Sequence, residues 1–169
     1  MKKNAPIICL LIIALISSSF SPKEGEVSIQ WMTMEEAFKA TQSKPKKIFI
    51  DVYTDWCGWC KKMDKNTFEN VEIANYMNTH FYAVKFNAEQ KENIVLGEQT
   101  FKFVANGNRG YNELAPALMQ GKMTFPTVIV LNEKFQMLQP IPGYREPKEM
   151  KTILEFFATN KHLQKPVEE

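Results

Sequence analysis

Two cysteines, Cys57 and Cys60, stand three residues apart, just after an apolar run that ends near Tyr53. Residues at i and i+3 of a helix lie on one face, so both sulfurs can point the same way if a helix starts here. A thiolate at a helix start is favoured by the dipole and by unpaired backbone N–H groups. The spacing therefore indicates a redox dithiol, with Cys57 attacking a partner's disulfide and Cys60 resolving the mixed disulfide.

The same spacing occurs in structural disulfides and in halves of zinc sites. A zinc site needs four ligands, and the other candidates, His80 and His162, show no ligand spacing between them. We therefore expect no metal at Cys57 and Cys60. A structural bridge remains an alternative at this point.

Asp51 is the second candidate catalytic residue, because it interrupts the apolar run just before the cysteines. A buried carboxylate costs several kcal/mol if it stays charged and dry, so burial raises its pKa. We expect Asp51 to accept a proton from Cys60, through a water molecule, as Cys60 attacks the mixed disulfide. The alternative is a solvated aspartate or an ion pair with Lys85, and such a pair does not exclude the proton role.

The rest of the sequence predicts an alternation of strands and helices that would position these residues. Strands are expected at 27–31, 46–53, 81–86, 127–131 and 135–139. Helices are expected at 33–42, 57–64, 71–78 and 112–119, and from Pro147 onwards. The segment 93–104 fits a helix interrupted by Gly97, and 106–110 fits a loop. Early alternation implies parallel pairing and the late short turn an antiparallel hairpin, which together make a mixed sheet with helices on both faces.

The N-terminal segment has the pattern of a secretory signal. Lys2 and Lys3 precede an uncharged apolar run at 5–16, and small polar residues follow. We expect a cleaved signal at 1–21, with an uncleaved N-terminal anchor as the alternative, and a periplasmic or otherwise exported protein. The domain would then be 22–163, with a flexible tail at 164–169.

Cleavage would also change the composition. It would remove Cys9, leaving Cys57 and Cys60 as the cysteine pair, and it would take the net charge from +2 to zero. A neutral chain gives no reason to expect binding to nucleic acid or, once the signal is removed, to a membrane surface.

Taken together, these residues resemble the thioredoxin superfamily, in order and rough spacing from about residue 27 to 160. The resemblance consists of Asp51, the motif Trp56-Cys57-Gly58-x-Cys60-Lys61, Lys85, the pair Pro126-Thr127 and Gly143. It implies an α/β thioredoxin fold, a mixed central β-sheet flanked by helices on both faces, with Pro126 cis and facing the cysteines. It also implies a supporting role for Lys85 and a substrate groove formed by Trp56, Gly58, Trp59, Phe125 and Pro126.

Two departures from the family pattern stand out. Trp59 occupies the position where ordinary thioredoxins carry proline, which leaves the redox potential open. The stretch between Lys85 and Pro126 is longer than in a minimal thioredoxin, so 88–110 reads as an insertion before the cis-proline strand. The insertion either shapes partner choice or is a surface elaboration.

The leading hypothesis is therefore an exported thiol–disulfide oxidoreductase that acts on protein disulfides, of the reductase or isomerase type, as a monomer and without a bound cofactor. Its expected partners are protein thiols and disulfides, with a membrane thiol protein as electron donor. The alternatives are a thioredoxin-fold copper(I) metallochaperone, with Met63 or Met123 as an extra ligand, and a thiol carrier in cytochrome maturation. A structural disulfide in a scaffold domain is a further alternative.

Overall fold

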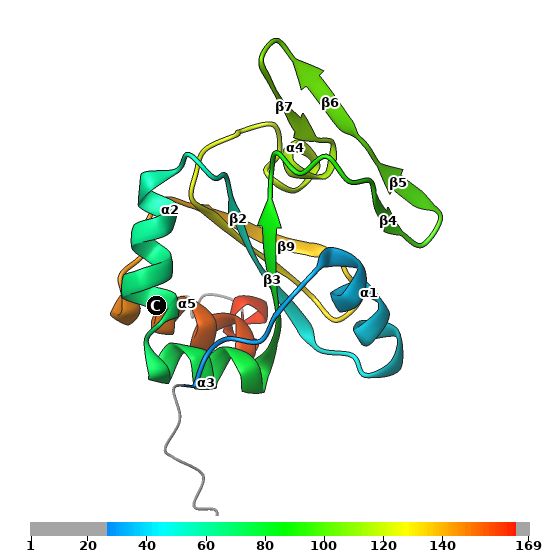
Figure 1. The fold of residues 1–169 in the computed structure, drawn as a ribbon. Coiled ribbons are helices and arrows are strands. Elements are labelled where there is room, and N and C mark those ends of the chain that lie inside the picture. The colour runs from blue at the N-terminus through cyan, green and yellow to red at the C-terminus, as the bar shows by residue number, and fades with distance from the viewer. Residues whose placement is uncertain (1–26, 165–169) are drawn as a thin grey trace, which may run out of the picture.

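A five-stranded mixed sheet in the order β1-β3-β2-β8-β9 forms the centre of the molecule (Figure 1). The computed structural model describes residues 27–164, so the expected signal at 1–21, Cys9 and most of the expected tail lie outside the described residues. The strands are β1 Trp31–Met32, β2 Lys47–Tyr53, β3 Phe81–Asn87, β8 Thr127–Leu131 and β9 Met137–Pro142. β1, β3 and β2 run parallel, whereas β8 is antiparallel to both β2 and β9. The mixed sheet expected from the sequence is thus confirmed.

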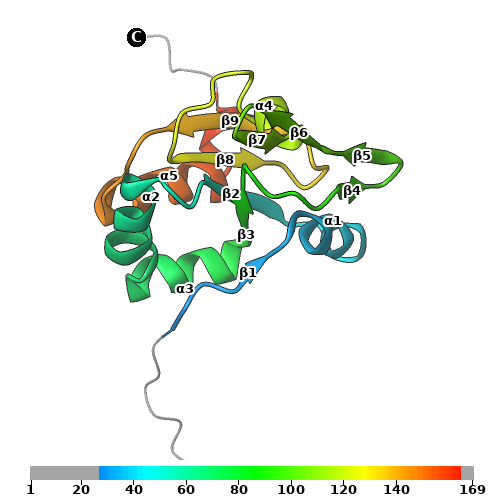
Figure 2. The same ribbon diagram turned by 45° about the horizontal axis from the view of Figure 1, so that its top comes forward.

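Helices cover both faces of this sheet (Figure 2). They are α1 Met34–Ser43, α2 Gly58–Met63, the π-helix η1 Asp64–Phe68, α3 Val71–His80, α4 Leu114–Leu118, α5 Pro147–Ala158 and the short 3-10 helix η2 Lys161–Leu163. α1 and α4 pack on the face that carries Ile48, Ile50 and Val52 of β2. α2, η1, α3 and α5 pack on the opposite face, with Phe49. Because side chains alternate along a strand, Asp51 belongs to the same face as Phe49, beneath α2 and η1.

The ends of several helices follow from local sequence. Thr33 and Glu36 form a capping box at the start of α1, in which each side chain accepts a hydrogen bond from the other's backbone N–H. Pro147 occupies the first turn of α5, whose apolar stripe includes the buried Met150, Leu154 and Phe157. These two predicted helices are confirmed.

The segment 93–104 is not helical, and this expectation was wrong. Two hairpins replace it: β4 Ile94–Leu96 with β5 Gln99–Phe101, and β6 Phe103–Asn106 with β7 Arg109–Asn112. Each hairpin has a two-residue loop that begins with a glycine at positive φ, +63° at Gly97 and +59° at Gly107. Such loops match the twist of paired strands, so the glycines direct the chain into hairpins rather than interrupting a helix.

Three other expected elements differ in extent. The strand expected at 27–31 is limited to β1, because only Trp31 and Met32 pair with β3. The helix expected at 112–119 is shortened to α4. The last strand begins at Met137 rather than at 135, because Phe135 lies in a turn with φ of +62°.

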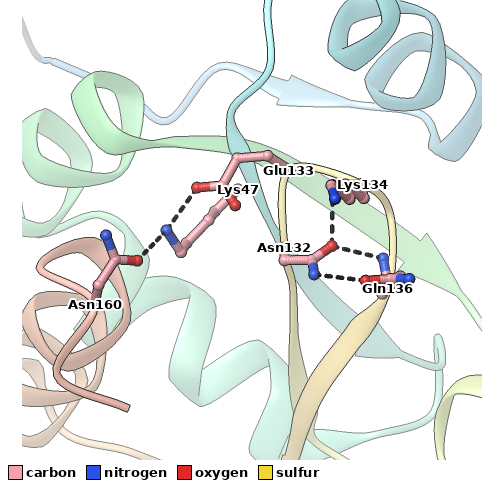
Figure 3. A network of polar contacts seen from close by, with 6 residues as sticks. All are labelled: Lys47, Asn132, Glu133, Lys134, Gln136 and Asn160. Atoms are coloured by element: carbon pink, nitrogen blue, oxygen red, sulfur yellow. Dashed lines mark hydrogen bonds and ion pairs between the residues drawn. The ribbon is translucent and has the colours of Figure 1, made fainter. Parts of the chain in front are cut away.

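At the end of the sheet where β2 begins, Lys47 and Asn132 are the centres of two groups of polar contacts (Figure 3). The Lys47 ammonium donates to Glu133 Oε1 at 2.6 Å and to Asn160 Oδ1 at 2.7 Å, which joins β2 to the β8–β9 turn and to the end of α5. Asn132 Oδ1 accepts from the backbone N–H groups of Lys134 and Gln136 and so holds that turn. Among residues 27–164, no helix is long and apolar enough to cross a membrane.

Candidate active site

Cys57 and Cys60 are joined by a disulfide at the start of α2, with their Cα atoms 5.3 Å apart. Cys57 is the N-cap residue, and its Sγ accepts a hydrogen bond from the Cys60 backbone N–H at 3.1 Å. Both side chains are buried. Because an N–H donor stabilises negative charge, the same contact would favour a thiolate at Cys57 when the disulfide is reduced. The same local structure therefore suits both the Cys57–Cys60 disulfide and a reduced pair with a thiolate at Cys57.

Asp51 lies in β2 with its side chain almost completely buried, at 1% exposure. Its Oδ2 pairs with the Lys85 ammonium at 2.7 Å, across the β2–β3 register, while its Oδ1 has no partner among the described residues. Burial raises the pKa of Asp51 to about 6, and this effect outweighs the opposing attraction of Lys85. A carboxyl group with this pKa exchanges protons near neutral pH.

Lys85 links Asp51 to a second carboxylate, Asp64, the first residue of η1. Burial alone would lower the pKa of Lys85, but the two carboxylates prevail and the net shift is upward. The ammonium also lies 5.1 Å from the ring centres of Trp31 and Tyr53, and 5.4 Å from that of Phe68. Sequence reasoning missed Asp64, although its spacing of four residues from Cys60 is a helical signal.

This spacing places Cys60 near the acid–lysine cluster. The Asp64 backbone N–H donates to the Cys60 carbonyl oxygen, so the two residues lie one helical turn apart on the same side of the helix. Within residues 27–164 no hydrogen bond joins Asp51 to either cysteine. Proton transfer from Cys60 to Asp51 through a bridging water, which the sequence suggested, stays a prediction. Lys85 and Asp64 also line an open pocket of about 600 Å³, which gives this cluster contact with solvent.

Two exposed tryptophans flank the disulfide, Trp56 at 52% and Trp59 at 57% exposure. The Trp59 ring packs against Tyr144 at 5.5 Å between centroids, and the Lys62 ammonium lies 4.7 Å from its centre. Exposed aromatic rings beside a reactive group offer apolar contact area to a bound chain.

Trp56 is held by residues from distant parts of the chain. Its ring meets Phe125 edge to face at 5.8 Å, and its Nε1–H donates to Glu89 Oε1 at 3.0 Å. The guanidinium of Arg109, from the β6–β7 hairpin, lies 5.0 Å from the ring centre. Sequence reasoning missed Glu89 and Arg109, because no local motif marks either residue.

The Phe125–Pro126 peptide bond is cis, as the family resemblance implied. The Pro126 carbonyl accepts from the Gly143 backbone N–H at 2.8 Å, which joins the residue before β8 to the residue after β9. Of the expected groove residues, the structure brings Trp56 and Phe125 into contact, whereas Trp59 packs on Tyr144. A side chain at Gly58 would meet no atom within 4 Å, so the helix surface is open there.

The residues considered as metal ligands are dispersed. Met63 is fully buried in the apolar cluster beneath α2, whereas Met123 is exposed. His80 packs on Tyr76 in α3, and His162 packs on Phe157 near the C-terminal end of α5. In the described part of the chain, no three His, Cys, Asp or Glu side chains converge on a common point.

Comparison with known proteins identifies the fold and the family. A family model with the description "Thioredox_DsbH: Protein of unknown function, DUF255" matches residues 13–136. "Uncharacterized protein B0495.5" of Caenorhabditis elegans is 31% identical over 77 residues, which are 46% of this chain and 11% of that protein. "Protein disulfide-isomerase" of Ricinus communis is 26% identical over 114 residues, 62% of this chain and 23% of that protein. The chain thus matches only about a tenth to a quarter of the length of these curated relatives.

Solved structures show the same architecture. "DsbH Oxidoreductase" superimposes with a TM-score of 0.55 at 17% identity, covering 78% of this chain and 85% of that one. A thioredoxin from Thermus thermophilus gives 0.59 at 14% identity, covering 79% and 89%. The fold is therefore a thioredoxin fold, and in this chain it carries the Cys57–Cys60 disulfide at the start of α2.

Proposed function

We propose that this chain, which belongs to the Thioredox_DsbH family, is an enzyme that reduces or rearranges disulfides of other proteins through Cys57 and Cys60. One observation carries the proposal. The Cys57–Cys60 disulfide closes the first turn of α2, between two exposed tryptophans and on a thioredoxin fold with a cis Pro126. A disulfide that served only to staple the fold would not need these surroundings.

The reaction proceeds in two thiol–disulfide exchanges. In the reduced protein, the Cys57 thiolate attacks one sulfur of the partner's disulfide, and the other partner sulfur leaves and takes up a proton. Cys60 then loses its proton and attacks Cys57 Sγ, which closes the Cys57–Cys60 disulfide and releases the second partner thiol. The partner gains two electrons and two protons, and a dithiol electron donor must return the same number to this protein.

Asp51 serves as the proton acceptor for Cys60 in the second exchange. Its pKa of about 6 keeps it largely ionised at neutral pH, yet close enough to neutrality to take and release a proton. Its unpartnered Oδ1 offers an acceptor for the bridging water. Lys85 supports this role by holding the other carboxylate oxygen in place.

The partner segment binds in a groove formed by Trp56, Gly58, Trp59, Phe125 and Pro126. The two tryptophans, each next to one cysteine in the chain, supply exposed apolar surface, and the open surface at Gly58 leaves room for a chain to approach. Phe125 extends the Trp56 side of this surface.

We also propose that the protein works as a monomer outside the cytosol, in the periplasm or an equivalent compartment. The basic and then apolar start of the sequence supports export. Outside the cytosol, a reductase needs a source of electrons, and a membrane dithiol protein is the class of donor that can provide them.

An insulin-reduction assay with dithiothreitol as electron donor tests the proposed activity. The wild-type protein should accelerate reduction, and Cys57→Ser should abolish the acceleration. Cys60→Ser should accumulate a mixed disulfide between Cys57 and the partner, visible by mass spectrometry under non-reducing conditions. Full activity in Cys57→Ser would refute the proposal.

A further inference from the structure

The β6–β7 hairpin places one cation at the rim of the candidate active site. The end of β3, the β6–β7 hairpin and the start of α2 all lie in the upper half of the molecule as drawn in Figure 1. Arg109 begins β7 directly after the hairpin loop, and its guanidinium covers the ring of Trp56 at 5.0 Å from the centre. Trp56 immediately precedes Cys57. A partner segment bound at Cys57 can therefore contact the Arg109 guanidinium with a residue a few positions from its own cysteine.

The position of Arg109 is fixed from both sides. In the hairpin, Asn106 pairs with Arg109, and a Cβ at the buried Gly110 would come within 2.2 Å of the Phe103 ring, so the strands close tightly here. At the root of the hairpin, the buried Asn112 donates from its side chain to the Glu92 carbonyl at 3.1 Å. The hairpin is therefore a formed element that holds its first β7 residue in place.

Trp56 is equally well positioned. Glu89 accepts from its indole N–H, and Phe125 packs against its ring. The indole thus provides a fixed platform, and a guanidinium stacked on such a platform loses little freedom on binding a further partner.

The N–H groups of the Arg109 guanidinium are available to bind a partner. Within residues 27–164 its guanidinium takes part in no hydrogen bond or ion pair, and the side chain is exposed. Two carboxylates lie in the same region, but Glu89 accepts from Trp56, and Asp55 accepts from the Asn87 side chain at 3.2 Å. A planar guanidinium with free N–H groups binds a carboxylate through two parallel hydrogen bonds.

A second cation lies on the other tryptophan of the motif, Trp59. The Lys62 ammonium lies 4.7 Å from the Trp59 ring centre and, among the described residues, forms no ion pair. Each tryptophan of the Trp56-Cys57-Gly58-Trp59-Cys60 motif therefore carries a cation on its ring, which favours partners that bring negative charge to this rim.

We propose that Arg109 is a specificity-determining residue that selects protein disulfides flanked by acidic side chains. The inference rests on the proposed function and deepens it, because it names the class of substrate. A glutamate or aspartate a few residues from the partner's cysteine binds the Arg109 guanidinium while the cysteine sits at Cys57. The insertion thereby becomes one wall of the substrate groove.

Three disulfide-linked peptide dimers test this selection. Each short peptide carries one central cysteine, flanked by glutamates, glutamines or lysines. Turnover with dithiothreitol is followed by chromatography of the released thiol peptide. At low salt the wild-type kcat/KM should be about fivefold higher for the glutamate peptide than for the glutamine peptide, mainly through KM, and the lysine peptide should be the poorest. The preference should shrink as salt is added.

Variants at position 109 test whether Arg109 causes the preference for the glutamate peptide. Arg109→Gln should bring the glutamate-to-glutamine ratio close to one, and Arg109→Lys should keep only part of it, because lysine lacks the planar fork. Lys102→Gln is the matched control: it removes the same charge from an exposed lysine between β5 and β6 and should leave the ratio unchanged.

Each outcome is decisive. Equal turnover of the three peptides by the wild-type protein, or a preference that Arg109→Gln retains, overturns the inference and leaves the proposed function standing. Failure of the wild-type protein to reduce any of the peptides overturns the proposed function, and the inference with it.

Discussion

Two lysine–carboxylate clusters occur in the central sheet, and they are built in opposite ways. At the start of β2, Lys47 is buried at 7% side-chain exposure, and its carboxylate partner Glu133 is 43% exposed (Figure 3). Towards the other end of β2, the carboxylate of Asp51 is buried at 1%, and its lysine partner Lys85 is 21% exposed. The carboxylate of Glu133 is thus largely open to solvent, whereas that of Asp51 is almost completely enclosed by protein.

The pKa shifts of the two carboxylates follow this difference. Burial pulls the pKa of Glu133 upward, but the hydrogen bond and charge of Lys47 outweigh it and the net shift is downward. At Asp51 burial prevails over Lys85, and the pKa rises to about 6. Asp51 also leaves one oxygen unpartnered. The comparison teaches that an ion pair with an accessible carboxylate stabilises the fold, whereas one with a buried carboxylate holds a group poised for proton transfer.

Replacing Asp51 by Asn should have the largest effect. Loss of the proton acceptor should slow disulfide reduction on the order of 100- to 1,000-fold at neutral pH, as general bases typically contribute. The wild-type rate should increase as pH rises through about 6, and the variant should lose this inflection. Stopped-flow measurement of mixed-disulfide resolution between pH 5 and 8 checks both. A variant that keeps the inflection would assign it to another group.

The same carboxyl group should make the fold less stable as pH rises. The pKa of Asp51 is raised in the folded state from 3.8 to about 6, so its contribution to stability is fully present below 3.8 and is lost as pH rises through 6. A shift of about two pKa units corresponds to about 3 kcal/mol. Urea unfolding of the oxidised protein at pH 4 and 7 should show this loss in the wild type and not in Asp51→Asn. An unchanged pH dependence in the variant would contradict it.

The residues that the sequence could identify are those whose role is encoded locally. The sequence predicts the Cys57–Cys60 pair because one helical turn brings residues at this spacing together. Asp51 could be identified because a charge interrupts an apolar strand, and the ion pair with Lys85 that the sequence left as an alternative is present. The cis bond before Pro126 came from the family resemblance, because an X–Pro bond alone leaves both isomers open.

The hairpins and their contacts could not be predicted from local sequence in this way. In 94–112 the two-residue loops at Gly97 and Gly107 decide the structure, and a glycine such as Gly97 in a short apolar stretch is compatible with either a turn or a broken helix. Glu89 lies 33 residues from Trp56, so their hydrogen bond depends on how the finished sheet brings the two loops together. The Arg109 contact requires the hairpin itself. Contacts between residues this far apart in the chain have no characteristic spacing in the sequence from which they could be predicted.

Replacing Lys47 by Met tests the structural cluster. Met fills a similar volume but cannot donate to Glu133 and Asn160, so the free energy of unfolding should fall by about 1–2 kcal/mol. Urea unfolding at pH 7 measures the loss. Insulin reduction should stay at the wild-type rate, because this cluster lies at the end of the sheet away from the cysteines. Reduced activity in a folded Lys47→Met protein would break the distinction between the two clusters.

Glu133→Gln should have the smallest effect, and its pH dependence should have the opposite sign to that of Asp51. The pKa of Glu133 is lowered in the folded state, so its contribution is present above the unfolded value of 4.5 and is lost as pH falls through the lower folded value. Because the carboxylate is 43% exposed, water screens the pair and the contribution should stay below about 1 kcal/mol. Urea unfolding at pH 7 and 3 should therefore show a small deficit for the variant that disappears in acid. A deficit that grew in acid would mean that Glu133, like Asp51, is held in its protonated form, and the two clusters would then differ in position alone.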